Sequence, residues 1–255
     1  PYNLVEVKLH RDGANADGPL DLFFAPVIGH NNANVNVLAA AAMMNGNGFR
    51  MEPGSTETNG LLPIAVDWDT WYDFTHATEP GGLFTDDYYY HEDSGAVSAG
   101  SDGILEMNMY PNGTYEYLGS PNNSTSDISR QILYGLNAFD FSFFPNGEIK
   151  ASWENPLIVN GDTGLSAGIK DELAAIIGKP RAIPIFSEVG GGNGNNADYT
   201  VVKFVGIRIV NVKLTGNPNQ KRVMIQACPY TDRTVTRTYT TFDSEAILAP
   251  PFLIE

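Results

Sequence analysis

The sequence has a single cysteine, Cys228, and lacks any long apolar run. One cysteine cannot form an internal disulfide, and because Cys228 closes the apolar segment 223–228, we predict that its thiol is buried and unreactive. No stretch reaches the roughly 18–20 consecutive apolar residues of a membrane-spanning helix. We therefore expect no membrane span in the chain as given.

Basic residues are also scarce. There are 15 Lys and Arg against 30 Asp and Glu, a formal net charge of −15. This charge argues against nucleic acid as a partner and favours cations or basic surfaces. Residues 1–178 hold 6 basic and 24 acidic side chains, whereas residues 179–255 hold 9 and 6. Either the charged loops fall early in the chain, or subunits associate head to tail, with the basic end of one against the acidic body of the next.

No motif in the sequence supports an enzyme. Asp162-Thr163-Gly164 matches the tripeptide of aspartic proteases, but it occurs once, whereas that chemistry needs two carboxylates that share a proton. We predict a turn there. The glycine-rich segment 190–196 lacks the Lys-Ser/Thr of a phosphate loop and predicts a hairpin tip. No zinc-site spacing links the four histidines, which are His10, His30, His76 and His91.

Glycine and proline are plentiful, with 26 Gly and 16 Pro, and turn-forming residues recur between short apolar runs. This pattern is typical of β-structure. We predict a mainly β (α+β) fold, an antiparallel β-sandwich-like body with two or three short helices packed on it. The chain forms one domain, 1–255, or two intimate lobes of about 1–118 and 119–255.

The strongest predicted strand is 199–214, which is apolar on both faces and should therefore lie at the centre of a sheet, with a bend at Gly206. Segment 221–228 should pair with it, and the more polar segment 233–241 should lie at an edge. The other predicted strands cover residues 4–9, 20–28, 35–38, 104–110, 114–118, 141–144, 149–153 and 182–186.

Two short helices are predicted. One begins at a cap on Thr125 or Ser126 and ends at Gly135, and the other begins at Ser166 and ends at Gly178. Segment 79–103 should be irregular. It contains Tyr88-Tyr89-Tyr90, of which at least one should be exposed, because neighbouring side chains of an extended segment point to opposite sides.

An acidic and aromatic cluster is the best candidate for a metal site. Asp67, Asp69 and Asp73 alternate with aromatic residues, and their carboxylates could bind Ca²⁺ or contact a sugar, although the loop glycine and terminal Glu of an EF-hand are missing. The alternative is that the aromatic residues belong to the core. A second acidic group, with a solvated loop as its alternative, comprises Asp86, Asp87, Glu92, Asp93 and Asp102.

Both ends of the chain are apolar. The C-terminal segment 246–255 either packs on its own domain or pairs with the sheet edge of a neighbouring subunit, and the N-terminal strand could do the same. If the protein polymerises, the predicted contact residues are Tyr2, Leu4, Val5, Val7, Leu9, Ile247, Leu248, Phe252, Leu253 and Ile254.

The opening segments VEVKLHRD, PLDLFFAPVIG and ANVNVLAAAA resemble the region that follows the membrane helix in TadE/TadG-like proteins of the tight-adherence (Flp) pilus assembly group. The fuller resemblance is to large TadG-related proteins of the planctomycete type. It continues through segments 61–66, 119–124, 160–170 and 180–226. Such proteins begin with an apolar helix, so we expect that this helix was removed on maturation or lies upstream of Pro1.

The resemblance implies a non-enzymatic, extracellular or cell-surface bacterial protein. It would be a self-associating subunit or assembly component of a pilus-like appendage, a filament or tube. Its partners would be further copies of itself and other surface or pilus proteins. The resemblance implies no cofactor. The alternative is an adhesin module that binds glycan with Ca²⁺ through the acidic and aromatic loops.

Overall fold

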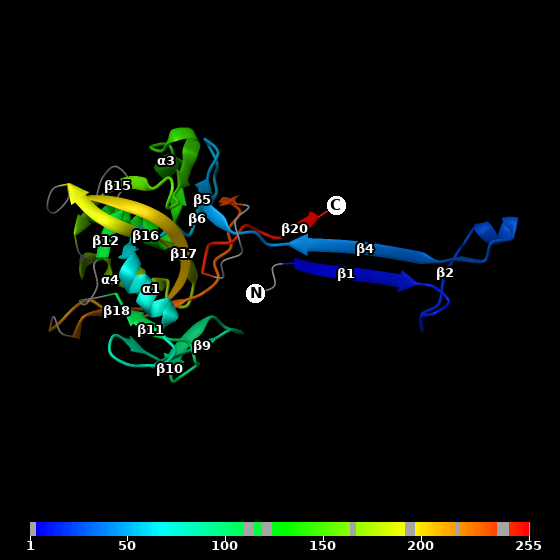
Figure 1. Ribbon diagram of the computed structural model, residues 1–255, viewed down its shortest axis with the longest axis horizontal. Coiled ribbons are helices and arrows are strands. Elements are labelled where there is room, and N and C mark those ends of the chain that lie inside the picture. The colour runs from blue at the N-terminus through cyan, green and yellow to red at the C-terminus, as the bar shows by residue number, and fades with distance from the viewer. Residues whose placement is uncertain are drawn as a thin grey trace. The chain divides into compact units, whose positions relative to one another are not determined.

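The computed structural model describes residues 4–109, 115–118, 124–163, 167–191, 197–217, 220–238 and 245–254 (Figure 1). The chain divides into two compact units, Pro1–Met44 with Pro250–Glu255, and Asn45–Ala249. The alternative of two lobes placed their boundary near residue 118, which is not where these two units divide. The predicted β-rich α+β class is confirmed. Among the described residues, no helix is long and apolar enough to cross a membrane.

The first unit is built on two long antiparallel strands, β1 (Leu4–Arg11) and β4 (Val35–Ala42), which pair over their full length. A short strand, β20 (Phe252–Ile254), pairs with the other edge of β4, so the strand order is β1-β4-β20. The predicted strand 20–28 is wrong over most of its length. It forms β2 (Leu20–Asp21), which pairs with β3 (Asn32–Ala33), and then a 3-10 helix, η1 (Ala25–Ile28). Pro26 lacks the N–H of a strand residue and favours this turn.

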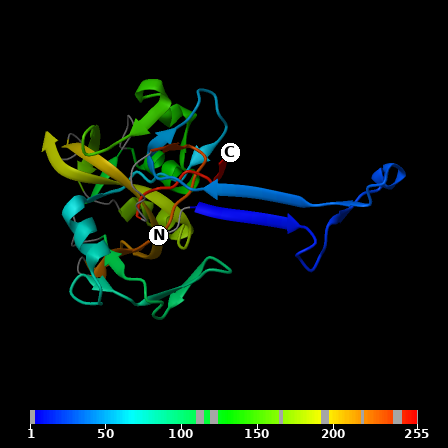
Figure 2. The ribbon, with the colours of Figure 1, turned by 45° about the vertical axis from the view of Figure 1, so that its right-hand side comes forward.

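The second unit contains an eight-stranded sheet whose centre is β17 (Ala197–Lys213), as predicted for segment 199–214. Figures 1 and 2 show β16 and β17 as two long, curved strands that run side by side. β17 also pairs with β15, so that β7, β16, β17, β15 and β12 close a ring of strands. The strand order is β15 (Leu157–Thr163), β12 (Tyr115–Leu118), β7 (Ala65–Asp67), β16 (Pro180–Gly191), β17, β18 (Arg222–Ala227), β11 (Glu106–Asn108) and β8 (Phe84–Thr85).

Three helices cover one side of this sheet: α1 (Trp68–His76), α2 (Thr125–Tyr134) and α4 (Lys170–Ala175). Their apolar side chains, among them Trp71, Ile132 and Leu173, are fully buried in one cluster with Ile207 of β17. Their spacing along each helix puts the apolar residues on the face that meets the sheet. This cluster is the larger core of the unit.

A second cluster lies around Phe204 of β17, which packs edge to face on Phe49. It is covered by a three-stranded sheet of order β14-β5-β19 and by the one-turn helix α3. β19 is an edge strand, as predicted for 233–241. The remaining bounds are β5 (Gly46–Arg50), β6 (Thr58–Asn59), β9 (Tyr88–His91), β10 (Ala96–Ala99), β13 (Leu136–Asn137), α3 (Ala138–Phe141), η2 (Pro145–Gly147), β14 (Glu148–Lys150), η3 (Ala167–Ile169) and β19 (Val235–Arg237).

Gly206 is required by a close approach of two backbones. A Cβ atom there would lie 2.2 Å from the Cys228 carbonyl oxygen and 2.8 Å from the Tyr230 nitrogen. β17 continues through Gly206, and its pairing with β18 shifts register only between Ile209 and Asn211. Gly206, where a bend was predicted, is therefore required mainly because it leaves room for the neighbouring backbone.

Several local predictions are corrected. The strand predicted at 141–144 is instead the last residue of α3 and the turn after it, because Asn137 and Asp140 form a capping box that starts a helix. The cap of α2 is Ser124 and not Thr125 or Ser126. The strand predicted over 104–110 is limited to Glu106–Asn108 within the described residues, and 149–153 to Glu148–Lys150.

Other local features follow or depart from the predictions in a similar way. Segment 79–103 contains the hairpin of β9 and β10 and is not wholly irregular. Its Tyr89 is exposed, as expected for at least one of the three tyrosines. Asp162-Thr163 ends β15 and pairs with β12, so the predicted turn does not begin there. The predicted cap Ser166 and residues 192–196 of the predicted hairpin tip lie outside the described residues, whereas Gly190 and Gly191 belong to β16. Cys228 is buried, and burial raises the pKa of its thiol, as expected of an unreactive cysteine.

Candidate functional site

The acidic and aromatic cluster predicted at Asp67, Asp69 and Asp73 is a helix. Asp67 is the N-cap of α1 and accepts a hydrogen bond of 2.9 Å from the Thr70 nitrogen, while Asp69 lies in the first turn. Trp71 and Phe74 point into the core. Among the described residues, these carboxylates do not form part of a group of three potential ligands. We did not predict this helix, because acidic and aromatic residues alternate in segment 67–74, where strong helix-forming residues would be expected.

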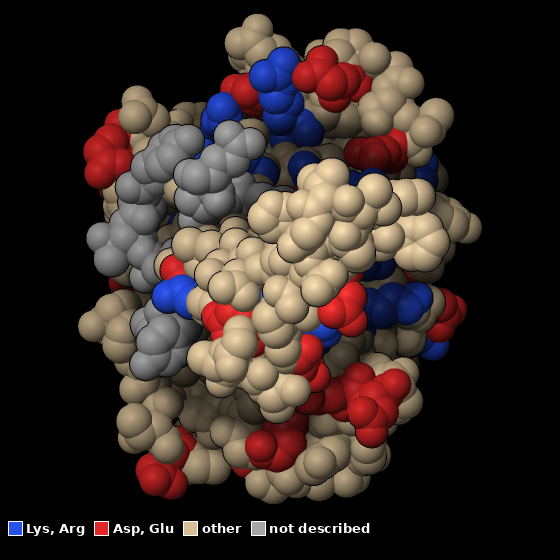
Figure 3. Space-filling model, turned by 90° about the vertical axis from the view of Figure 1, so that its right-hand side faces the viewer, with Lys and Arg blue, Asp and Glu red and all other residues tan. Residues whose placement is uncertain are grey.

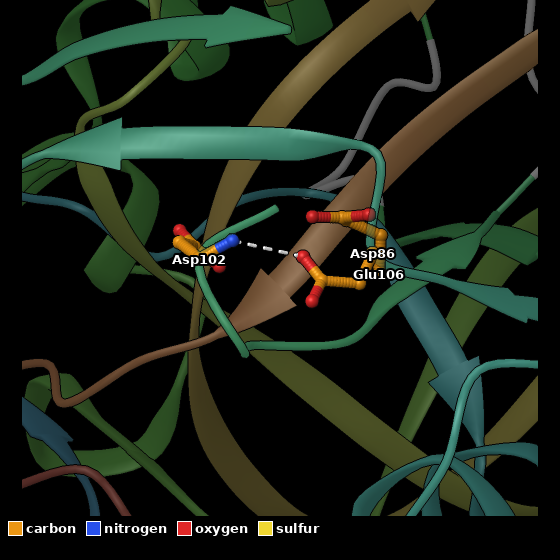
Figure 4. Close-up of side chains that lie close together, drawn as sticks. All are labelled: Asp86, Asp102 and Glu106. Carbon is orange, nitrogen blue, oxygen red and sulfur yellow. Dashed lines mark hydrogen bonds between the residues drawn. The ribbon is translucent and has the colours of Figure 1, made fainter. Parts of the chain in front are cut away.

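Three other carboxylates do converge, those of Asp86, Asp102 and Glu106 (Figure 4). One oxygen of each lies within 4.8 Å of the others. Asp86 follows β8, Asp102 lies in the loop before β11, and Glu106 begins β11, whose pairing with β8 brings the three together. Asp86 and Asp102 belong to the second predicted acidic group, but Glu106 was not predicted. The one sign of its role in the sequence is that Glu106 lies within a predicted strand, because a carboxylate is unusual in the core.

Hydrogen bonds hold this carboxylate cluster in place. Asp86 accepts from the Ser101 hydroxyl at 2.5 Å, the Asp102 nitrogen at 3.0 Å and the Gly103 nitrogen at 3.1 Å. Asp102 accepts from the Tyr90 nitrogen at 2.9 Å and from the Ile104 nitrogen at 3.0 Å. These bonds tie the loop before β11 to the end of β8 and to β9.

Glu106 is the buried member of the cluster. It accepts from the Asp87 nitrogen at 2.7 Å and the Thr85 hydroxyl at 3.3 Å. The buried Gln226 amide of β18 donates to Glu106 at 2.9 Å and to Asp102 at 3.2 Å. Burial raises the pKa of Glu106, whereas the Ser101 hydrogen bond lowers the pKa of Asp86.

All six carboxylate oxygens of the cluster accept at least one hydrogen bond from the protein. A cation is therefore not needed to satisfy them, and their evident effect is to join three segments of the sheet edge. We assign the carboxylate cluster a structural role.

The ribbon of β1 and β4 carries most of the predicted N-terminal contact residues. Leu4, Val5, Val7 and Leu9 are all exposed on β1, and Tyr2 lies outside the described residues. The C-terminal part of the prediction needs correction. Ile247 and Leu248 are buried in the second unit. Phe252, Leu253 and Ile254 pair with β4 of their own chain as β20. This outcome agrees with the alternative in which the tail packs on its own chain.

One face of this ribbon is apolar from Val5 to Leu9, and Arg11 at the end of β1 is the charged residue that shares it. In the register of β1 and β4, Val5 lies opposite Ala41, Val7 opposite Ala39 and Leu9 opposite Val37. Because side chains alternate along a strand and opposite residues share a face, these six side chains lie together. We call them the apolar face; its members are Val5, Val7, Leu9, Val37, Ala39 and Ala41.

The loop between the two strands exposes further apolar side chains, which the sequence analysis did not single out. Phe23 and Phe24 are 89% and 80% exposed, and Val27 and Ile28 are also exposed. At roughly 150–250 Å² per aromatic side chain, the two phenylalanines alone present about 300 Å². A typical monomer shows no more than about 300–600 Å² in its largest apolar patch. The run LDLFFAPVI at residues 20–28 could have indicated these exposed apolar side chains, but we predicted a strand there.

Charge is not separated in space as it is along the sequence. The more basic segment 179–255 supplies β16, β17 and β18, which lie in one sheet with β7, β11 and β15 from the acidic segment. In Figure 3, acidic and basic side chains are mixed over the upper and middle parts of the view, and only acidic ones are seen in its lower part. The separation along the sequence therefore does not mark two separate bodies.

Together these features define a β-rich α+β protein with an exposed, apolar two-stranded ribbon. Comparison of the chain with protein-family models, curated proteins and solved structures finds no match.

Proposed function

We propose that this protein is a self-associating structural subunit, and that the ribbon of β1 and β4 is its contact element. The observation that carries the proposal is the apolar face, which the pairing of β1 with β4 leaves uncovered. β20 pairs only with Ala40–Ala42 of β4, so most of the ribbon has two strands, which are marginal in water by themselves, and exposed apolar patches mark contact sites. The occupant we propose is a second copy of the same chain.

The free edge of β1 supports this choice. β1 pairs only with β4 among the described residues, so its other edge offers unpaired backbone groups to an added strand. If two β1 strands pair antiparallel about an axis at Val7, Glu6 of each copy faces Lys8 of the other. Val5 then faces Leu9, so the apolar faces of both ribbons join into one surface. The charges and the apolar residues favour the same register.

A joined apolar surface of this kind would still be open to water, and a further pair of chains could cover it. Two different contacts on each chain are enough for a linear polymer. The resemblance to TadE/TadG-like proteins supplies the context. We accordingly propose a non-enzymatic component of a pilus-like appendage at the bacterial cell surface, with other surface or pilus proteins as further partners.

A charge-exchange experiment tests the contact between β1 strands. Glu6→Lys places two lysines opposite each other in the proposed register, and Lys8→Glu places two glutamates opposite each other. Each variant alone should associate more weakly than the unchanged chain, as measured by sedimentation velocity. An equal mixture of the two variants should recover association, because every Lys then faces a Glu.

The mixture separates contacts between chains from contacts within one chain. Glu6 and Lys8 form an ion pair of 2.7 Å in their own strand, and both variants lose that pair whether alone or mixed. Recovery on mixing can therefore come only from pairing between chains. Equal association of each single variant and of the mixture would refute the register, and a chain that stays monomeric at every concentration would refute self-association.

A further inference from the structure

A polar pocket lies in the second unit and shares no residue with the carboxylate cluster. Its volume is about 330 Å³, and it is formed by β6, the end of α2, the start of β16 and the segment after β18. This volume is at the lower end of the range for small-molecule sites. The polar side chains that line it are Thr58, Asn59, Tyr134, Arg181, Tyr230 and Asp232.

Arg181 is the unusual member of this lining. Its guanidinium makes one long hydrogen bond, 3.5 Å from Nη1 to the Pro180 carbonyl, and its buried Nε has no hydrogen-bond partner. Among the described residues, no carboxylate lies within 4.0 Å of it, although acidic residues are twice as numerous as basic ones in this chain. A partly buried cation without a counter-ion costs free energy, which an incoming anion would offset.

The acidic residue of the pocket is already engaged. Asp232 accepts from the nitrogen and hydroxyl of Thr234 at 2.8 and 2.6 Å, and from the Tyr230 hydroxyl at 2.9 Å. The Tyr230 hydroxyl in turn accepts from the Gly60 nitrogen at 2.7 Å. This network fixes Asp232 on one wall and leaves Arg181 unpaired.

The charges and shape of the pocket indicate the class of ligand. A guanidinium matches the planar fork of a carboxylate, and the fixed negative charge of Asp232 disfavours a doubly charged phosphate. The exposed Thr58 can bond a hydroxyl group, and the exposed ring of Tyr134 can lie against the face of a sugar. We propose that this pocket binds a hydroxylated monocarboxylate of the hexuronate class, with Arg181 holding the carboxylate.

This binding site is independent of the proposed self-association, since no residue of the ribbon takes part. The test is calorimetric titration of the full chain with sodium glucuronate, compared with glucose and with inorganic phosphate at equal ionic strength. Glucuronate should bind saturably, glucose should not bind measurably, and phosphate should bind more weakly than glucuronate. Binding of phosphate that equals or exceeds that of glucuronate would overturn the proposed ligand class.

Arg181→Gln should weaken glucuronate binding at least about tenfold, because it removes a charge-assisted bidentate contact. Arg222→Gln is the matched control. Arg222 is an exposed arginine on strand β18, where its Nε donates to Asn211 at 2.7 Å, and its replacement should leave glucuronate binding unchanged. Equal affinities for the unchanged chain and a folded Arg181→Gln variant would overturn the proposal.

A measurement on the unchanged chain covers the case in which Arg181→Gln does not fold. In a ¹H–¹⁵N spectrum, glucuronate should shift the amide signals of Gly60 and Gly135, which both line the pocket. The signal of Gly190, on the exposed end of β16, should stay in place. Unmoved Gly60 and Gly135 signals at saturating glucuronate would overturn the proposal.

Discussion

Replacing Val37 by threonine tests whether the apolar face is buried when the protein associates. Val37 is 50% exposed on β4 and lies opposite Leu9, so it does not take part in the proposed β1 edge. Full burial of a valine side chain is worth about 1.5–3 kcal/mol, so the exposed half can still contribute about 1 kcal/mol. A symmetric contact contains the side chain twice, which gives about 2 kcal/mol, or an increase of about thirtyfold in the dissociation constant.

Threonine favours strands, and its hydroxyl can reach water at this half-exposed position, so the variant should keep the fold of the single chain. Val189→Thr is the matched control, because Val189 is 44% exposed on strand β16 of the second unit. Sedimentation equilibrium over a range of concentrations gives the dissociation constants of both variants, for comparison with that of the unchanged chain. The reasoning is refuted if Val37→Thr changes the constant less than about threefold, or if Val189→Thr weakens association equally.

Two further predictions concern the second unit. Gly206→Ala should destabilise the fold by about 3 kcal/mol, because its Cβ would meet the Cys228 carbonyl at 2.2 Å. Gly190→Ala, with nothing within 4 Å, should stay within about 0.5 kcal/mol of the unchanged chain, and equal urea midpoints for the two variants would contradict this. Burial raises the pKa of Glu106 in the folded chain above its ordinary value of 4.5. The contribution of Glu106 to stability is therefore fully present below pH 4.5 and is lost as the pH rises through the folded pKa. Glu106→Gln should therefore lose this part of the pH dependence in urea unfolding, and a stability difference between variant and unchanged chain that is constant with pH would count against it.

Longer elements could be predicted because their pattern is local. β17 is apolar on both faces, and its length and lack of breaks identify a central strand in any arrangement. α2 ends at Gly135, whose positive φ of 84° few other residues adopt. Helix α3 was missed because it is one turn long and depends on the single capping box of Asn137 and Asp140.

The carboxylate cluster and the lining of the polar pocket were harder to predict, for a different reason. Asp86, Asp102 and Glu106 come from three segments that meet only when β8 pairs with β11. Arg181 is one residue in an apolar strand pattern, and its neighbours in sequence do not indicate that, among the described residues, it has no carboxylate partner. Which charges find partners depends on contacts between residues far apart in the chain, such as Gly60 with Tyr230.

The sequence by itself determined the β-rich class, the central strand, the buried cysteine and the apolar character of both ends, because composition and alternation along a strand fix these locally. Only the tertiary structure decided how the two ends are used. Ile247 and Leu248 enter the core, where they are shielded from water, whereas β1 pairs along one edge and keeps Val5, Val7 and Leu9 exposed. An apolar side chain is buried only where another element covers it, and that depends on long-range pairing, which a sequence pattern does not specify.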